Sequence, residues 1–315
     1  MSINNKLRVV ASITTIPTRY DVLEKCIKSL SNQTYTLSQI YITIPAISRR
    51  SNKPYPPLTP YILDNPLCKV VNCEIDYGSI CKIYGGLVAE KDPDTLVCIV
   101  DDDIVVKNNH IEEMVKCHLK YPNDVICGTG GKIGLGNSHL KGMAIHFNIT
   151  HPIDVRGFFG FKDESLIDIP FGVGTYLFPR KAFPTNENLD NEIFKYVENK
   201  DIALNDDVLV GAYINKNNIK ARVFNNIPLI TMDLSAADAL SKDWLKSQKT
   251  LNNSIKEFRN LGVFTTTEPV SINETLIFKI IFIVIIIIIF ILLITYFKYN
   301  PFISPFISPF ISPLY

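Results

Sequence analysis

The sequence predicts an α/β domain with a mostly parallel central sheet and helices on both faces, followed by one C-terminal transmembrane helix. Between residues 7 and 127, short apolar runs alternate with segments whose apolar residues recur at helical spacing. This alternation is typical of a parallel sheet that helices cover on both faces. Further along, 20 of the 22 residues in 276–297 are apolar, and about 20 such residues suffice to cross a bilayer.

The elements of the first half follow from these patterns. In 21–30, for example, Val22, Cys26 and Ile27 share one face of a helix. Six prolines in 45–66 indicate a long loop instead. The predicted strands are 9–15, 39–44, 69–73 and 95–100, and the predicted helices are 21–30, 79–91 and 108–121.

The second half is predicted to be less regular, because its apolar runs are shorter and its glycines more frequent. In an open parallel sheet, ligands bind at the carboxyl ends of the strands. Two segments are expected there, namely 14–19 after the first strand and the three aspartates that follow the fourth. The later predicted elements are a strand at 124–127, an irregular stretch at 128–170, a helix at 205–215, extended segments at 220–224 and 228–232, and a helix at 241–260.

Composition excludes some functions and favours a reducing compartment. The chain has 32 Lys and Arg against 31 Asp and Glu, and a nucleic-acid binder would show a basic excess. An apolar fraction of 47% is too high for a disordered chain. Seven cysteines are an odd number, and none of them have CxxC spacing, so reduced thiols are expected rather than a disulfide framework.

The predicted transmembrane helix at 276–297 makes the chain a single-pass membrane protein with a C-terminal anchor. The N-terminal residues lack a charged region followed by a long apolar run, so no signal peptide is predicted and the body is expected in the cytoplasm. A linker at 266–275 precedes the helix. The tail at 298–315 carries three copies of Pro-Phe-Ile-Ser, whose prolines favour an irregular or extended conformation.

Three consecutive carboxylates, Asp101 to Asp103, follow a strongly apolar strand. Like charges in a partly desolvated place cost stability, and a bound Mg²⁺ or Mn²⁺ would remove that cost. In a strand, Asp101 and Asp103 would point to one side and Asp102 to the other. The alternative is an acidic loop that caps the helix at 108–121.

Four short motifs occur in a fixed order along the chain. They are Thr-Thr-Ile-Pro-Thr-Arg at 14–19, Asp-Tyr-Gly-Ser-Ile-Cys-Lys at 76–82, Val-Asp-Asp-Asp at 100–103 and Asn-Asp-Asp-Val at 205–208. Their order resembles the nucleotide-sugar-dependent glycosyltransferases of GT-A fold, and within them the family-2-like group with a DxD motif. The resemblance covers roughly residues 7–235. It implies a catalytic domain at 1–265, with a Rossmann-like nucleotide-binding half at 1–125 and an acceptor half at 126–240.

The resemblance also implies how the donor is held. Thr15 and Arg19 match positions that contact the nucleotide. Asp76 matches an acid that faces the base or ribose, and Lys82 matches a lysine that faces the diphosphate. Ser79 stands where the family's pattern usually has proline. The alternative for Lys82 is a lysine without a functional role on the surface of a helix.

The same resemblance assigns Asp101 and Asp102 to the nucleotide-sugar, and Asp101 and Asp103 to the divalent metal, Mn²⁺ or Mg²⁺. Many metal-dependent relatives add a histidine late in the catalytic domain, whereas the five histidines here all come before residue 152.

For the base that takes the acceptor's proton, the resemblance implies Asp207, with Asp206 as its acidic neighbour. Adjacent carboxylates raise one another's pKa toward a useful value. The alternative is a pair of surface or helix-capping aspartates. The stretch 171–176, Phe-Gly-Val-Gly-Thr-Tyr, resembles a glycine-rich loop on the acceptor side.

Together these observations favour a metal-dependent glycosyltransferase. It would move a sugar, with inversion, from a UDP- or GDP-linked donor to a hydroxyl of a glycan, lipid or protein acceptor. A second hypothesis is a catalytically degenerate transferase fold that serves as a membrane-tethered binding or scaffold protein. A third, a nucleotidyltransferase, normally has a glycine-rich basic loop after the first strand, which is absent here.

Overall fold

A computed structural model describes residues 6–133, 140–143, 163–172, 175–228, 230–232 and 244–265, together with positions 285 and 288. The chain divides into two compact units, Met1–Ser271 and Ile272–Tyr315. Apart from positions 285 and 288, the linker, transmembrane helix and tail predicted at 266–315 lie outside the described residues. None of the helices in the described part combines the length and the apolar character that crossing a bilayer requires.

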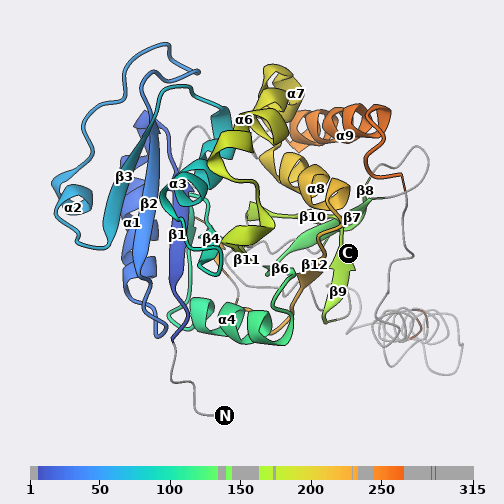
Figure 1. Ribbon diagram of the computed structural model, residues 1–315, viewed down its shortest axis with the longest axis horizontal. Helices are drawn as coiled ribbons and strands as arrows, with labels where there is room; N and C mark the ends of the chain where they lie inside the picture. Colours follow the sequence, from blue (N-terminus) through green and yellow to red (C-terminus); the bar gives the residue numbers. More distant parts are fainter. Residues whose placement is uncertain are drawn as a thin grey trace, which may run out of the picture. The chain divides into compact units, whose positions relative to one another are not determined.

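The first unit is built on a mixed, mostly parallel sheet of eight strands in the order β3-β2-β1-β4-β11-β6-β12-β9 (Figure 1). Four neighbouring pairs, β3–β2, β2–β1, β1–β4 and β6–β12, are parallel. The three pairs that involve β11 or β9 are antiparallel. The strands are β1 (Val9–Thr14), β2 (Gln39–Pro45), β3 (Cys68–Cys73), β4 (Leu96–Ile99), β6 (Val125–Cys127), β9 (Ser165–Ile167), β11 (Tyr176–Pro179) and β12 (Ala221–Val223).

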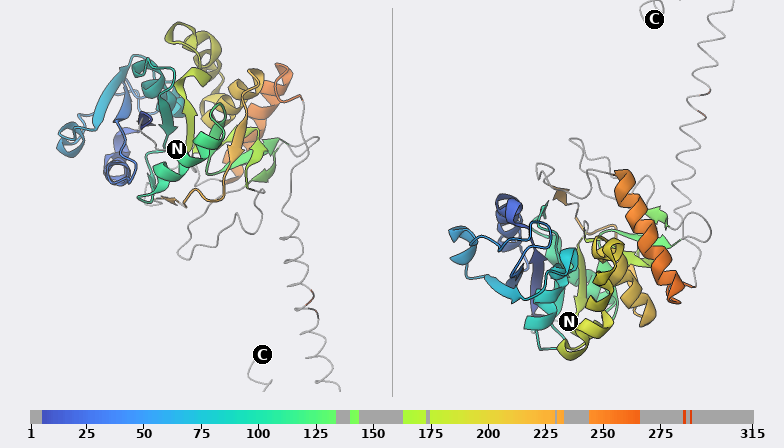
Figure 2. Two further views of the ribbon diagram at one scale, coloured as in Figure 1. Left: turned by 60° about the horizontal axis from the view of Figure 1, so that its bottom comes forward. Right: turned by 90° about the horizontal axis from the view of Figure 1, so that it is seen from above.

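Helices cover both faces of this sheet, as Figures 1 and 2 show. Successive residues of β1 enter opposite apolar cores, because side chains alternate along a strand. Val10 packs in a core with α3, α8 and α9, whereas Val9 and Ala11 pack in a core with α1 and α4. The helices are α1 (Tyr20–Ser31), α2 (Pro60–Leu63), α3 (Cys81–Ala89), α4 (His110–Lys120), α6 (Leu189–Glu192), α7 (Lys200–Ala203), α8 (Asp206–Lys216) and α9 (Trp244–Asn260).

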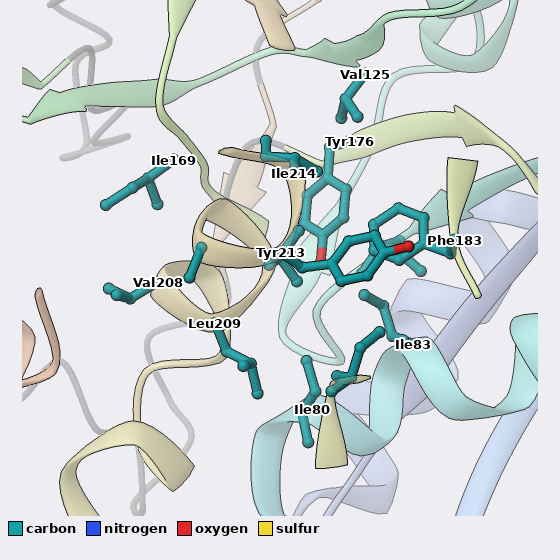
Figure 3. Packing of buried hydrophobic residues seen from close by; sticks show 14 of the residues in the cluster. Ile80, Ile83, Val125, Ile169, Tyr176, Phe183, Val208, Leu209, Tyr213 and Ile214 are labelled. Carbon is teal, nitrogen blue, oxygen red and sulfur yellow. The ribbon is translucent and has the colours of Figure 1, made fainter. Parts of the chain in front are cut away.

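The core between the sheet and α8 is rich in aromatic side chains. Figure 3 shows Tyr176 of β11, Tyr213 of α8 and Phe183 lying side by side. The rings of Phe183 and Tyr213 are stacked, with centroids 5.0 Å apart, and Phe178 lies 4.2 Å from Phe183. Offset ring pairs add about 0.5–1.5 kcal/mol each beyond the area that they bury. These contacts hold the C-terminal half of α8 against the sheet.

The prediction of an irregular stretch at 128–170 is wrong for several of its residues. These residues form β9, the last strand in the order of the main sheet, and the three strands of a separate sheet. The strand β11 was not predicted at all. The added strands are β5 (Ile104–Val105), β7 (Gly130–Ile133), β8 (Leu140–Met143), β10 (Ile169–Pro170) and β13 (Thr231–Met232). The strands β5 and β13 pair with each other in a third, two-stranded sheet.

Candidate functional site

The candidate site lies where three segments that are distant in the sequence meet. Lys82 is in the first turn of α3, Asp101 follows β4, and Asp206 and Asp207 form the first turn of α8. The carboxyl ends of parallel strands share one edge of a sheet, which brings Asp101 to the start of α3. The antiparallel strand β11 begins opposite Ile99 at the end of β4. The residues just before it therefore reach the same edge.

Lys82 is the centre of a charge cluster. Its Nζ atom lies 2.6 Å from Asp101 Oδ1, 2.6 Å from Asp206 Oδ2 and 3.8 Å from Asp207 Oδ1. The residue is 4% exposed. Burial alone would lower the pKa of this ammonium, but the three carboxylates outweigh burial and raise the pKa well above its usual value. Lys82 is thus a buried, permanently charged group and not a lysine on a helix surface.

The Asp207 carboxyl has a strongly raised pKa. Burial raises its pKa to about 8, and the charge of Asp206 adds to this effect. Lys82 and the Gly172 N–H act in the opposite direction, and that N–H donates to Asp207 Oδ1 at 2.9 Å. Burial likewise raises the pKa of Asp101. The cluster therefore contains more negative charge than its one lysine offsets.

The three consecutive aspartates bind two different cations. Arg19 Nη1 donates to Asp102 Oδ1 at 2.7 Å, and Arg19 Nη2 donates to Asp103 Oδ2 at 2.5 Å. Thr15 Oγ1 donates to Asp102 Oδ2 at 2.7 Å. Burial raises the pKa of Asp102 to about 6, although Arg19 and Thr15 lower it.

The predicted alternation does not continue through Asp103, because β4 already ends at Ile99. Asp103 shares Arg19 with Asp102, while Asp101 pairs with Lys82. The three carboxylates thus bind side chains of other segments, which differs from the alternative of a loop that caps α4.

Asp76 follows β3 and organises the neighbouring loops. Its Oδ1 accepts the Gly78 N–H at 2.8 Å, and its Oδ2 accepts the Arg49 N–H at 2.7 Å. Tyr55, from the same loop as Arg49, donates its hydroxyl to the Thr15 carbonyl at 3.2 Å. The loop after β2 therefore bridges the segments that carry Asp76 and Thr15. The sequence contains no signal for this contact of Arg49, because the donor is a backbone N–H, which every residue except proline has.

Gly172 fits against the charge cluster because it has no side chain. A Cβ at this position would lie 2.4 Å from Lys82 Nζ and 3.0 Å from Asp101 Oδ1. The glycine-rich stretch expected at 171–176 therefore contacts the cluster through this residue, while residues 173 and 174 lie outside the described ones.

Replacing Gly172 with alanine should displace the Lys82 ammonium from Asp101, because the new methyl group would lie only 2.4 Å from Lys82 Nζ. Overpacking of this kind costs about 1–3 kcal/mol. Thermal unfolding measures this loss. An alanine variant with unchanged stability would contradict this account.

Oxygen ligands for a divalent cation are abundant at this edge. Five carboxylates, from Asp101–Asp103 and Asp206–Asp207, face the two cations Lys82 and Arg19. In the described part of the chain, no three His, Cys, Asp or Glu side chains form a group that could hold a metal ion by themselves. Mg²⁺ is usually bound by one or two carboxylates together with substrate phosphates. The residues present fit a metal of that kind.

Comparison with models of protein families finds no match, and comparison with curated proteins finds none either.

Proposed function

We propose that this chain is a nucleotide-sugar-dependent glycosyltransferase with a GT-A-like arrangement. One observation carries the proposal. Lys82, Asp101 and Asp207 come from distant segments and meet at the carboxyl edge of the sheet, and Asp207 has a pKa of about 8. A cation beside a carboxylate base is the combination that transfer from a diphosphate requires.

In the proposed reaction, the acceptor hydroxyl attacks the anomeric carbon of the sugar from the face opposite the nucleotide. Asp207 takes the hydroxyl proton as the new C–O bond forms. The bond from the anomeric carbon to the diphosphate breaks, and its electron pair leaves with the nucleotide. Lys82 and Arg19 would stabilise the charge on the leaving diphosphate. Attack from the opposite face inverts the anomeric configuration.

The metal would be held by Asp101 and Asp103, as the DxD resemblance implies. When bound, Mn²⁺ or Mg²⁺ supplies positive charge that neutralises the leaving diphosphate. The five carboxylates at this edge support such a site, since Lys82 and Arg19 compensate for only part of their charge.

Chelation should therefore lower nucleotide-sugar hydrolysis by at least about tenfold, and added Mn²⁺ should restore it. Asp103→Asn should raise the Mn²⁺ concentration that gives half-maximal activity. Asp94→Asn is the matched control, because the Asp94 side chain is 71% exposed and pairs only with the surface residue Lys181 among the contacts described. Activity that is insensitive to both the chelator and Asp103→Asn would remove the metal from the proposal.

The alternative function is a binding or scaffold protein without catalytic activity, tethered to a membrane by 276–297. Calorimetry with UDP and GDP in Mn²⁺ separates the two. Binding accompanied by hydrolysis of a UDP- or GDP-sugar supports the enzyme. Binding without turnover of any donor supports the scaffold, and the absence of binding argues against both uses of this site.

A further inference from the structure

A buried histidine outside the charge cluster contacts Thr175, three residues after Gly172. His110 is the first residue of α4 and is 0% exposed. Its Nδ1 atom lies 3.2 Å from the Pro228 carbonyl, and its Nε2 atom lies 2.7 Å from Thr175 Oγ1. A carbonyl only accepts hydrogen bonds, so Nδ1 carries a proton. In the neutral ring, Nε2 then accepts from the Thr175 hydroxyl at this short distance, while Met114 Sδ lies farther from the same oxygen, at 3.3 Å.

Thr175 has an uncommon backbone conformation. Its φ angle is +57°, in the left-handed region that β-branched residues rarely adopt. Such conformations cost about 1–3 kcal/mol and persist only where the surroundings hold them. Here the side chain is 0% exposed, and its hydroxyl is bound to His110. The Thr175 carbonyl also accepts the Gly128 N–H at 3.3 Å.

A chain of hydrogen bonds runs from Thr175 to the carboxylates. The Thr175 N–H donates to the Gly172 carbonyl at 2.9 Å. The Gly172 N–H in turn donates to Asp207 Oδ1 at 2.9 Å. Thr175 and Asp207 therefore bind the two peptide groups on either side of the Gly172 Cα atom. Lys82 and Asp101 fill the space next to Gly172, and this close packing restricts the movement of its backbone.

We propose that His110 is a positioning residue for Asp207, which it orients through Thr175 and Gly172. The inference rests on the proposed function only where it treats Asp207 as the base. The contacts described for His110 are with Pro228 and Thr175, which are not members of the charge cluster. It holds Thr175 in its left-handed conformation, and Thr175 fixes the direction of the Gly172 amide.

The test compares two substitutions of Thr175, each of which changes one substituent on its Cβ atom. Thr175→Val keeps the branched shape but removes the hydroxyl that His110 accepts from. Thr175→Ser keeps the hydroxyl and is the conservative rescue. His110→Phe removes both ring nitrogens in a similar volume, and it serves as the second variant. All are made in the full-length chain, solubilised in detergent, and their thermal unfolding is recorded first.

Two measurements test the proposal. Hydrogen exchange of the Gly172 amide, observed with ¹⁵N-glycine labelling, reports whether its bond to Asp207 is kept. Thr175→Val and His110→Phe should increase this exchange rate at least about tenfold, and Thr175→Ser should not. In the kinetic assay, the first two variants should lower kcat by about 10- to 100-fold with little change in KM.

The two readouts separate failure of this inference from failure of the proposed function. If the wild-type protein transfers and hydrolyses no sugar, the proposed function fails, and the exchange of the Gly172 amide alone decides the positioning role. If Thr175→Val and Thr175→Ser exchange this amide at the same rate, the positioning role is overturned. The same conclusion follows if His110→Phe lowers only the unfolding temperature.

Discussion

Replacing Lys82 with methionine should lower the free energy of unfolding by about 3–5 kcal/mol. Methionine keeps the length of the side chain but leaves Asp101, Asp206 and Asp207 without the ammonium that lies 2.6–3.8 Å from them. Removing one partner from a buried ion pair leaves the remaining charges desolvated and uncompensated. Urea unfolding followed by circular dichroism at pH 8 measures the loss.

The pH dependence of that loss is part of the prediction. Lys82 lowers the pKa of both Asp101 and Asp207, so its removal raises both further in the folded state. A carboxyl with a raised folded pKa stabilises the protein at low pH and loses that contribution as the pH rises. The variant should therefore be closest to wild type near pH 5. Lys181→Met is the control, because Lys181 is half-exposed and pairs with an exposed aspartate. A loss below about 1 kcal/mol for Lys82→Met, as expected of a surface pair, would contradict the account.

Asp207→Asn should lower kcat for sugar transfer or nucleotide-sugar hydrolysis by about 10²–10⁴-fold. Asparagine keeps the shape of the side chain but accepts no proton from the acceptor hydroxyl. The affinity for UDP or GDP should change little, because Lys82, Arg19 and Asp101 remain. Steady-state kinetics and calorimetry on the same preparations separate the two quantities. Asp94→Asn should leave both unchanged.

The pH profile of the proposed activity in the wild-type protein gives a second check on Asp207. A base acts in its deprotonated form, and the pKa of Asp207 is raised to about 8 by burial and by Asp206. The rate should therefore rise with pH up to about 8 and then level off. Asp206→Asn removes the neighbouring charge and should move this rise to lower pH. A rate that is constant between pH 6 and pH 9 would exclude Asp207 as the base.

The first half of the fold was predictable from local pattern. The helix expected at 21–30 is α1, and the strand expected at 39–44 is β2, each within two residues at both ends. The misses have a common cause. The strand β11 has only four residues, follows a glycine-rich stretch and pairs with strands about 50 to 80 residues away in sequence. Nothing in the residues 176–179 themselves specifies such distant partners.

The site was predictable in residue type but not in arrangement. Lys82, Asp101 and Asp207 were singled out from motifs, and the structure brings them together. The pairing of Asp103 with Arg19 was not predicted, because it depends on where β4 ends. His110 offered no signal, since a single histidine at the start of a helix is compatible with many environments. Its contacts with Thr175 and Pro228 come from packing.

The place of β11 in the sheet has a consequence for synthesis of the chain. Leu96 to Ile99 pair on one side with β1, which is already made, and on the other side with residues 176–179. At about 5–20 residues per second, β11 follows β4 from the ribosome by roughly 4–16 s. During that interval the backbone N–H and C=O groups along one edge of β4 lack their native partner strand. Unpaired edges of this kind recruit other chains, so aggregation during translation should originate from β4.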